Sequence, residues 1–236
     1  MDPSVRLSAL VLAVTVCSSI PCAQQAPTPP RREHTELQPV ASALTDHSPE
    51  YRLELRRVLL RDAPDPGRDG VRVLVCPSFE CEMLLTLHRI DAGWRARVVR
   101  ADNPIWDAVV EKRAVDATKR NVRERAIPDG IAARITSATV TLLLRTRYEH
   151  RDAVHLDGVT HTFLGWMEGI GDLQGVAHSP AAGTRPDLLV KVADACITFV
   201  LADDASAAKQ LAAVEAAIAR LEQALASLPA DAATKR

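Results

Sequence analysis

The feature that most constrains the fold of this chain is a pair of alternating apolar segments around a short polar stretch. Apolar residues occupy every second position on both sides of it, at Val71, Val73, Val75, Met83, Leu85 and Leu87. A period of two is typical of strands that bury one face and leave the other in water. The pattern therefore predicts two strands of an antiparallel sheet over these residues.

Two neighbouring segments extend this predicted sheet to a four-strand meander. Tyr51–Arg56 alternates apolar and charged residues, and Trp94–Val98 follows the turn signal Asp91-Ala92-Gly93. A second hairpin is predicted from Gly158, with a glycine-containing turn between residues 159–166 and 173–180. All of these strands are expected to lie in antiparallel sheets.

Four helices are predicted between and after the strands. The first two span about 103–125 and 131–142, although their apolar stripes are thin or rich in β-branched residues. Thr184, followed by a proline and by Asp187, is typical of a third helix start. The last helix carries apolar residues at alternating spacings of three and four, at Leu211, Val214, Ile218, Leu221, Leu225 and Leu228. Strands followed by helices predict an α+β fold.

The amino-terminal residues predict export from the cytoplasm. Leu7–Val16 is an apolar run of ten residues after a short basic start, which is too short for a membrane span and fits a cleavable signal peptide ending at Ala23. A lipid anchor at Cys17 or Cys22 is the alternative, although the preceding residues fit it poorly. The expected organisation is a signal peptide at 1–23, a proline-rich disordered leader at 24–49, a domain at 50–204 and a C-terminal amphipathic helix at 205–236.

Composition excludes some classes of function. The formal net charge is −1, which does not indicate a nucleic-acid binder. Aromatic residues make up only 3% of the chain, which argues against a surface on which sugars or single-stranded nucleic acids stack. No segment after residue 23 is long and apolar enough to span a membrane. A periplasmic or secreted bacterial protein is the expected context, and export permits disulfides. Cys76 and Cys81 are therefore predicted to form a disulfide across the first hairpin turn, while Cys196 is expected to be a buried apolar residue.

Two groups of polar residues are candidate sites. His161 and His178 are equidistant from the second hairpin turn and are predicted to face each other. Such a pair could share a proton or hold a metal ion such as zinc, and His155 or Asp157 could complete the site; ordinary sheet packing is the alternative. The predicted first sheet also carries arginines that could dock an acidic partner or form a solvated face. These arginines are Arg52, Arg56, Arg72, Arg95 and Arg97.

No catalytic signature of the serine hydrolases, zinc proteases or nucleotide-binding enzymes is present. The sequence therefore favours an exported, non-enzymatic binding or inhibitor-like module with a protein partner in the cell envelope. Two alternatives stay open. One is a small metal-dependent or hydrolytic enzyme built on the three histidines. The other is an envelope subunit that forms homodimers or larger assemblies through residues 211–228.

Overall fold

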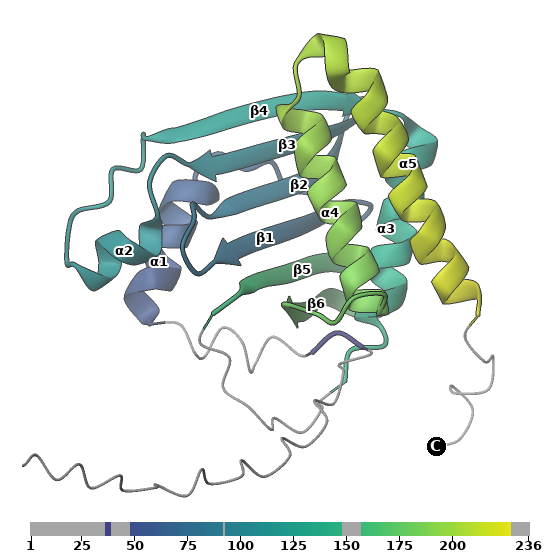
Figure 1. The fold of residues 1–236 in the computed structure, drawn as a ribbon, viewed down its shortest axis with the longest axis horizontal. Coiled ribbons are helices and arrows are strands. Elements are labelled where there is room, and N and C mark those ends of the chain that lie inside the picture. Colours follow the sequence, from purple (N-terminus) through teal and green to yellow (C-terminus); the bar gives the residue numbers. More distant parts are fainter. Residues whose placement is uncertain (1–35, 39–47, 92, 148–156, 228–236) are drawn as a thin grey trace, which may run out of the picture. The chain divides into compact units, whose positions relative to one another are not determined.

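The computed structural model describes residues 36–38, 48–91, 93–147 and 157–227, and these form an α+β fold. Six antiparallel strands make one sheet in the order β4-β3-β2-β1-β5-β6 (Figure 1). The strands are β1 (Val71–Pro77), β2 (Met83–Ile90), β3 (Gly93–Ala101), β4 (Arg120–Ile127), β5 (Val159–Met167) and β6 (Gly171–His178). The helices are α1 (Pro49–Leu59), α2 (Ile105–Val110), α3 (Asp129–Leu143), α4 (Arg185–Leu201) and α5 (Asp204–Ala226).

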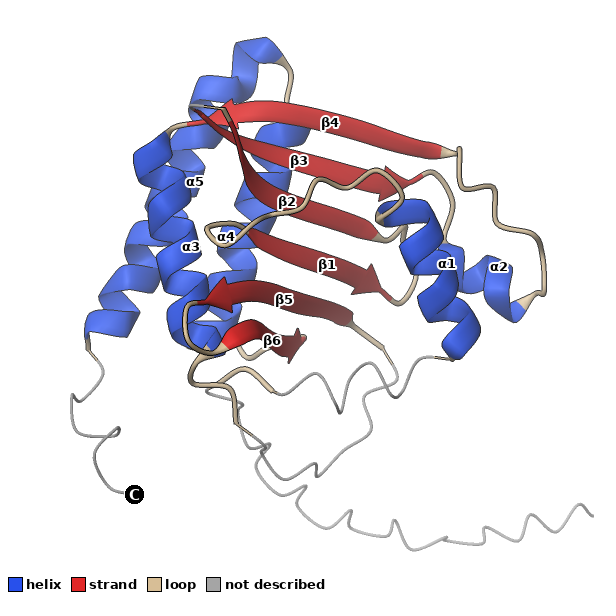
Figure 2. Ribbon diagram, turned by 180° about the vertical axis from the view of Figure 1, so that it is seen from behind, coloured by secondary structure: helices blue, strands red, loops and turns tan. Residues whose placement is uncertain are grey.

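Helices cover the two faces of the sheet unequally. Helices α3, α4 and α5 lie on one face, whereas α1 lies across one end of the opposite face (Figures 1 and 2). The main core lies between the sheet and the first group, where Val73, Val98 and Phe163 meet Cys196 and Ile218. A second cluster lies beneath α1 and includes residues from the opposite face of the same strands. The sheet face that bears α1 is called the outer face below.

The predicted strand at Tyr51–Arg56 is wrong, because these residues lie within α1. Ser48 caps the helix by accepting a hydrogen bond from the backbone N–H of Tyr51 at 3.2 Å. Tyr51, Leu55 and Val58 are buried at spacings of four and three. The apolar positions of this segment satisfy both periods, and the cap together with the early proline decides for the helix.

The predicted helix over 103–125 is also wrong. Only Ile105–Val110 is helical there, and Arg120–Ile127 forms β4. Strand β4 pairs with β3 from Trp94↔Ile127 to Ala101↔Arg120. The four-strand meander therefore exists as β1-β2-β3-β4, with β4 in place of the strand predicted at Tyr51–Arg56.

The other predicted elements are confirmed. Helix α3 and the hairpin of β5 and β6 occupy the expected segments. Thr184 caps α4 by accepting from the backbone N–H of Asp187, and Asp203 caps α5 by accepting from Ser206 at 2.8 Å. The apolar stripe of α5 packs on the chain's own core through Val214, Ile218 and Leu221. Within the described ranges, no helix combines the length and the apolar character that crossing a membrane requires.

A short piece of the predicted leader belongs to the fold. Gln38 and Val176 exchange two backbone hydrogen bonds of 2.9 and 2.7 Å, so residues 36–38 bridge the edge of β6. Leu37 is fully buried and lies against Gly175, where a Cβ atom would come within 3.1 Å of the Leu37 side chain. The signal peptide and most of the leader predicted at 24–49 lie outside the described residues.

Candidate functional site

The histidine pair predicted on the second hairpin does not form. The register of β5 and β6 pairs His161 with Ala177 and Thr160 with His178, so the strands are shifted by one residue from the symmetric hairpin. Side chains alternate across a sheet, and this shift places the two imidazoles on opposite faces. His155 lies outside the described residues.

Each of the two histidines has partners of its own. His161 is buried beneath α4, stacks on Phe163 and has its Nε2 atom 3.4 Å from Asp194 Oδ1. On the outer face, the Nδ1 atom of His178 lies 2.9 Å from the Thr160 hydroxyl. No group of three His, Cys, Asp or Glu side chains in the described part of the chain could hold a metal ion.

The predicted disulfide between Cys76 and Cys81 is not found, because all three described cysteines are free thiols. The β1–β2 register ends with Val75 opposite Met83, and its continuation sets Cys76 opposite Glu82 rather than Cys81. Cys76 and Cys81 are therefore not cross-strand partners, because their register differs by one residue. Burial raises the pKa of Cys76 to about 12, and Cys196, also buried, has its pKa raised to about 12.

The five predicted binding arginines separate into two groups. Arg52 and Arg56 belong to α1 and not to the sheet. Arg72 lies on β1, and Arg95 and Arg97 lie on β3. Because Leu84 and Val99 belong to the cluster beneath α1, the alternation of side chains places all three of these arginines on the outer face.

Strand register brings these three arginines together with polar residues that the sequence did not single out. Arg72 is opposite Thr86, Thr86 is opposite Arg97, and Arg97 is opposite Glu124, which makes one continuous row over β1-β2-β3-β4. In the next row His88 is opposite Arg95. We call this surface the arginine face, defined by Arg72, Thr86, His88, Arg95, Arg97 and Glu124.

His88 is the buried centre of the arginine face. Its exposed fraction is 1%, and neither ring nitrogen has a hydrogen-bond partner among the described residues. Its Nε2 atom is 3.8 Å from Glu124 Oε2, beyond hydrogen-bond distance. Burial lowers the pKa of His88, Glu124 opposes this, and the positive charges of Arg97, Arg72 and Arg95 lower it further. The imidazole is therefore held in its neutral form beside three cations.

Two of the arginines also have unused donors. The Nε atoms of Arg72 and Arg97 are buried without a hydrogen-bond partner in the described ranges, although Arg72 Nη2 donates to the Pro64 carbonyl at 2.5 Å. A buried donor that lacks an acceptor is costly. An anionic group entering between Arg95 and Arg97 would supply acceptors for this face.

A second buried polar cluster lies where α1 and α2 meet the sheet. Glu82 is fully buried and accepts hydrogen bonds from the Tyr51 hydroxyl at 2.8 Å and from the backbone N–H groups of Ile105 and Trp106 at 2.8 and 3.0 Å. The carboxylate is thus satisfied by groups of both helices. This arrangement is that of a structural anchor.

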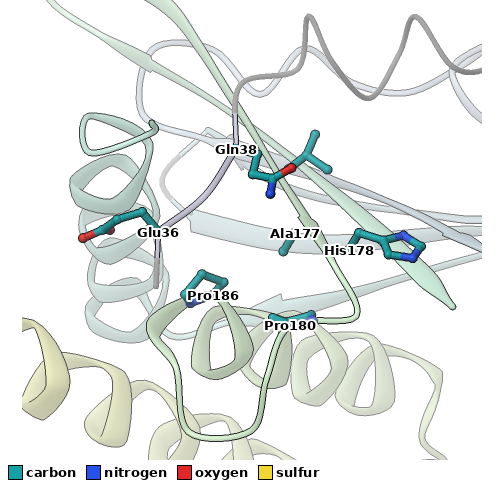
Figure 3. A pocket seen from close by; sticks show the side chains of 7 residues that line it. Glu36, Gln38, Ala177, His178, Pro180 and Pro186 are labelled. Carbon is teal, nitrogen blue, oxygen red and sulfur yellow. The ribbon is translucent and has the colours of Figure 1, made fainter. Parts of the chain in front are cut away.

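A small pocket of about 40 Å³ lies beside the edge of β6. Figure 3 shows Gln38, His178, Pro180 and Pro186 around it, with the carboxylate of Glu36 directed away from His178. Glu36 instead forms an ion pair with Arg185. The pocket is therefore formed in part by the chain's own leader segment.

Sequence reasoning missed His88, Thr86 and Glu124 for identifiable reasons. Thr86 and His88 interrupt an apolar run in which both faces of β2 are buried, and Glu124 lies in β4, within a segment that the sequence predicts as a helix. One signal was available: Thr86 and His88 are two residues apart, so in a strand they lie on the same face, opposite to the face of Leu85 and Leu87. Comparisons of the chain with protein-family models, with curated proteins and with solved structures give no match.

Proposed function

We propose that this chain is an exported, non-enzymatic binding protein that docks an acidic region of a protein partner on its arginine face. The observation that supports this best is the concentration of positive charge with unused donors. Three arginines act electrostatically on buried His88, and the carboxylates that act on these groups are Glu124 beside His88 and Asp65 beside Arg72. Carboxylates of a partner would compensate this charge and accept hydrogen bonds from the guanidinium groups of Arg95 and Arg97 that reach solvent.

The position of the face allows a partner to dock on it. Arg95 is exposed and Arg97 is half-buried, so the two can be reached from solvent. Arginine suits this role because its planar group donates two parallel hydrogen bonds to a carboxylate. The apolar run at Leu7–Val16 supports export, which would make the cell envelope the place where such a partner is met.

The direct test is the affinity of the purified protein for a fluorescent polyglutamate of about thirty residues, measured by anisotropy. We expect binding that weakens steeply between low and high salt, because the contact is electrostatic. The double variant Arg95→Glu/Arg97→Glu should lose at least tenfold in affinity. Polylysine of the same length should not bind.

A matched control separates the face from the net charge of the protein. Lys209→Glu/Arg220→Glu makes the same change in charge at two exposed positions of α5, in the helical layer on the other side of the sheet. This control should keep its affinity within about threefold, because the sheet separates α5 from the arginine face and salt weakens the effect of remote surface charges. Equal losses in both double variants, or no binding of polyglutamate at all, would refute the proposal.

A further inference from the structure

The two edges of the sheet differ in what covers them. At β6, Gln38 pairs with Val176 through two backbone hydrogen bonds, and the burial of Leu37 holds this segment in place. At β4, the only strand that pairs with it in the described part of the chain is β3 (Figure 1). The backbone N–H and C=O groups along the edge of β4 that points away from β3 are therefore available to another extended segment.

The side chains of β4 give this edge two different faces. Val122 and Ala126 are exposed on the outer face, on either side of Glu124. Arg123 and Arg125 point to the opposite face, where Arg125 contacts Asp204 at 3.2 Å and the Ala202 carbonyl at 2.7 Å. Arg123 is exposed and has no ion-pair partner among the described residues. The edge thus presents the exposed cation of Arg123 on one face, and Val122 and Ala126 with the carboxylate of Glu124 between them on the other.

We infer that an extended segment of the partner adds to β4 as a seventh strand and alternates acidic and apolar residues. An acidic side chain opposite Arg123 would make the cross-strand charge pair that this arginine lacks. Its two neighbours would then lie opposite Val122 and Glu124, and the next apolar residue along would lie opposite Ala126. This inference rests on the proposed function, because it describes how the same acidic partner contacts the edge next to the arginine face.

A second copy of this chain does not suit the site. Strand β4 holds Arg120, Arg123 and Arg125 against the single carboxylate of Glu124. In registers centred on Arg123 or on Glu124, two antiparallel copies of β4 would bring like charges opposite each other, which destabilises a strand pair. The same charges that prevent self-pairing favour a strand of opposite charge.

The test uses three synthetic octapeptides and the full protein. The first alternates valine and glutamate, the second alternates valine and lysine, and the third is the first peptide with N-methyl groups on alternate backbone nitrogens. N-methylation keeps every carboxylate and removes the main-chain donors along one edge. We expect the first peptide to bind, the second not to bind, and the third to bind at least tenfold more weakly than the first.

Variants of the protein provide the second arm. Arg123→Glu should weaken binding of the valine–glutamate peptide about tenfold, whereas Arg220→Glu on α5 should change it less than twofold. Hydrogen exchange of the β4 amides should slow when the peptide is bound. Strand addition is overturned if N-methylation and Arg123→Glu both leave the affinity unchanged while the peptide still binds.

The experiments separate a failure of strand addition at β4 from a failure of docking on the arginine face. Binding that depends on Arg95 and Arg97, but not on Arg123 or on N-methylation, refutes strand addition and keeps the acidic partner. Binding of the peptide that depends on Arg123 alone, with no effect of Arg95→Glu/Arg97→Glu on polyglutamate, supports the edge site and refutes docking on the arginine face.

Discussion

The hydroxyl of Tyr51 donates a hydrogen bond of 2.8 Å to Oε1 of Glu82, a carboxylate with no exposed surface. Burial, together with nearby Cys76 and Glu82, raises the pKa of Tyr51, so the hydroxyl keeps its proton and remains a donor. Glu82 also accepts from the first backbone N–H groups of α2. One carboxylate therefore joins both helices of the outer face to the sheet.

Replacing this carboxylate should destabilise the protein. Glu82→Gln leaves one amide oxygen where two carboxylate oxygens now accept three hydrogen bonds, so buried donors lose their acceptor. We predict a loss of about 2–3 kcal/mol in the free energy of unfolding, measured with urea. Glu80→Gln makes the same chemical change at an exposed position of the same turn and should stay within about 0.5 kcal/mol of the unmodified protein. Similar losses in the two variants would contradict the anchoring role.

The pKa of His88 predicts how stability depends on pH. The pKa of an unfolded histidine is about 6.5, and that of folded His88 is lower because of burial, with Arg97, Arg72 and Arg95 adding to the effect against Glu124. As the pH falls through 6.5, the unfolded chain gains this proton first, so the folded state loses stability until folded His88 titrates as well. Urea unfolding at pH 7.5 and 5.5 should show a smaller decline for His88→Gln than for the unmodified protein. The same decline in both would show that His88 is not held neutral.

The leader residue Leu37 should contribute to stability as a core residue does. Leu37→Ala removes a side chain with 0% exposure that packs against Gly175, and we expect a loss of about 2–4 kcal/mol. Leu53 is 63% exposed on α1, and Leu53→Ala should change stability by less than about 0.5 kcal/mol. Chemical denaturation of the two variants makes the comparison. An unchanged free energy of unfolding in Leu37→Ala would mean that residues 36–38 do not pack against β6 in solution.

Metal analysis tests the rival histidine site. His161 and His178 lie on opposite faces of the sheet, so they cannot share one ion. We expect less than 0.1 equivalents of zinc in protein purified without chelators and dialysed, and no change in His161→Ala/His178→Ala. Stoichiometric zinc that disappears in this double variant would restore the metal-dependent alternative.

The parts of the fold that the sequence predicted well are those specified by local signals. The caps at Thr184 and Asp203 lie next to long apolar stripes, so α4 and α5 could be located before any tertiary contact was known. The alternation of apolar residues in β1 and β2 is also a local signal, and it located these strands. The segment at 49–59 fits both periods, so its cap and early proline mark it as a helix, whereas the segment at 120–127 has no clear period and its pairing with β3 decides it.

The candidate site was less predictable because it depends on register. A shift of one residue in the second hairpin moved His178 to the face opposite His161. The arginine face arises from cross-strand partners that are far apart in the chain, such as Arg97 and Glu124. Sequence alone could name Arg72, Arg95 and Arg97, but their convergence on buried His88 required the strand order.

The most direct test of the central claim is to map where an acidic chain binds. Backbone and arginine side-chain NMR signals of the labelled protein would be followed while polyglutamate is added. Our account predicts shifts at Arg72, Arg95 and Arg97 and at the His88 ring, with α5 unchanged. Shifts spread evenly over the exposed basic residues, or confined to Lys209 and Arg220 on α5, would contradict it.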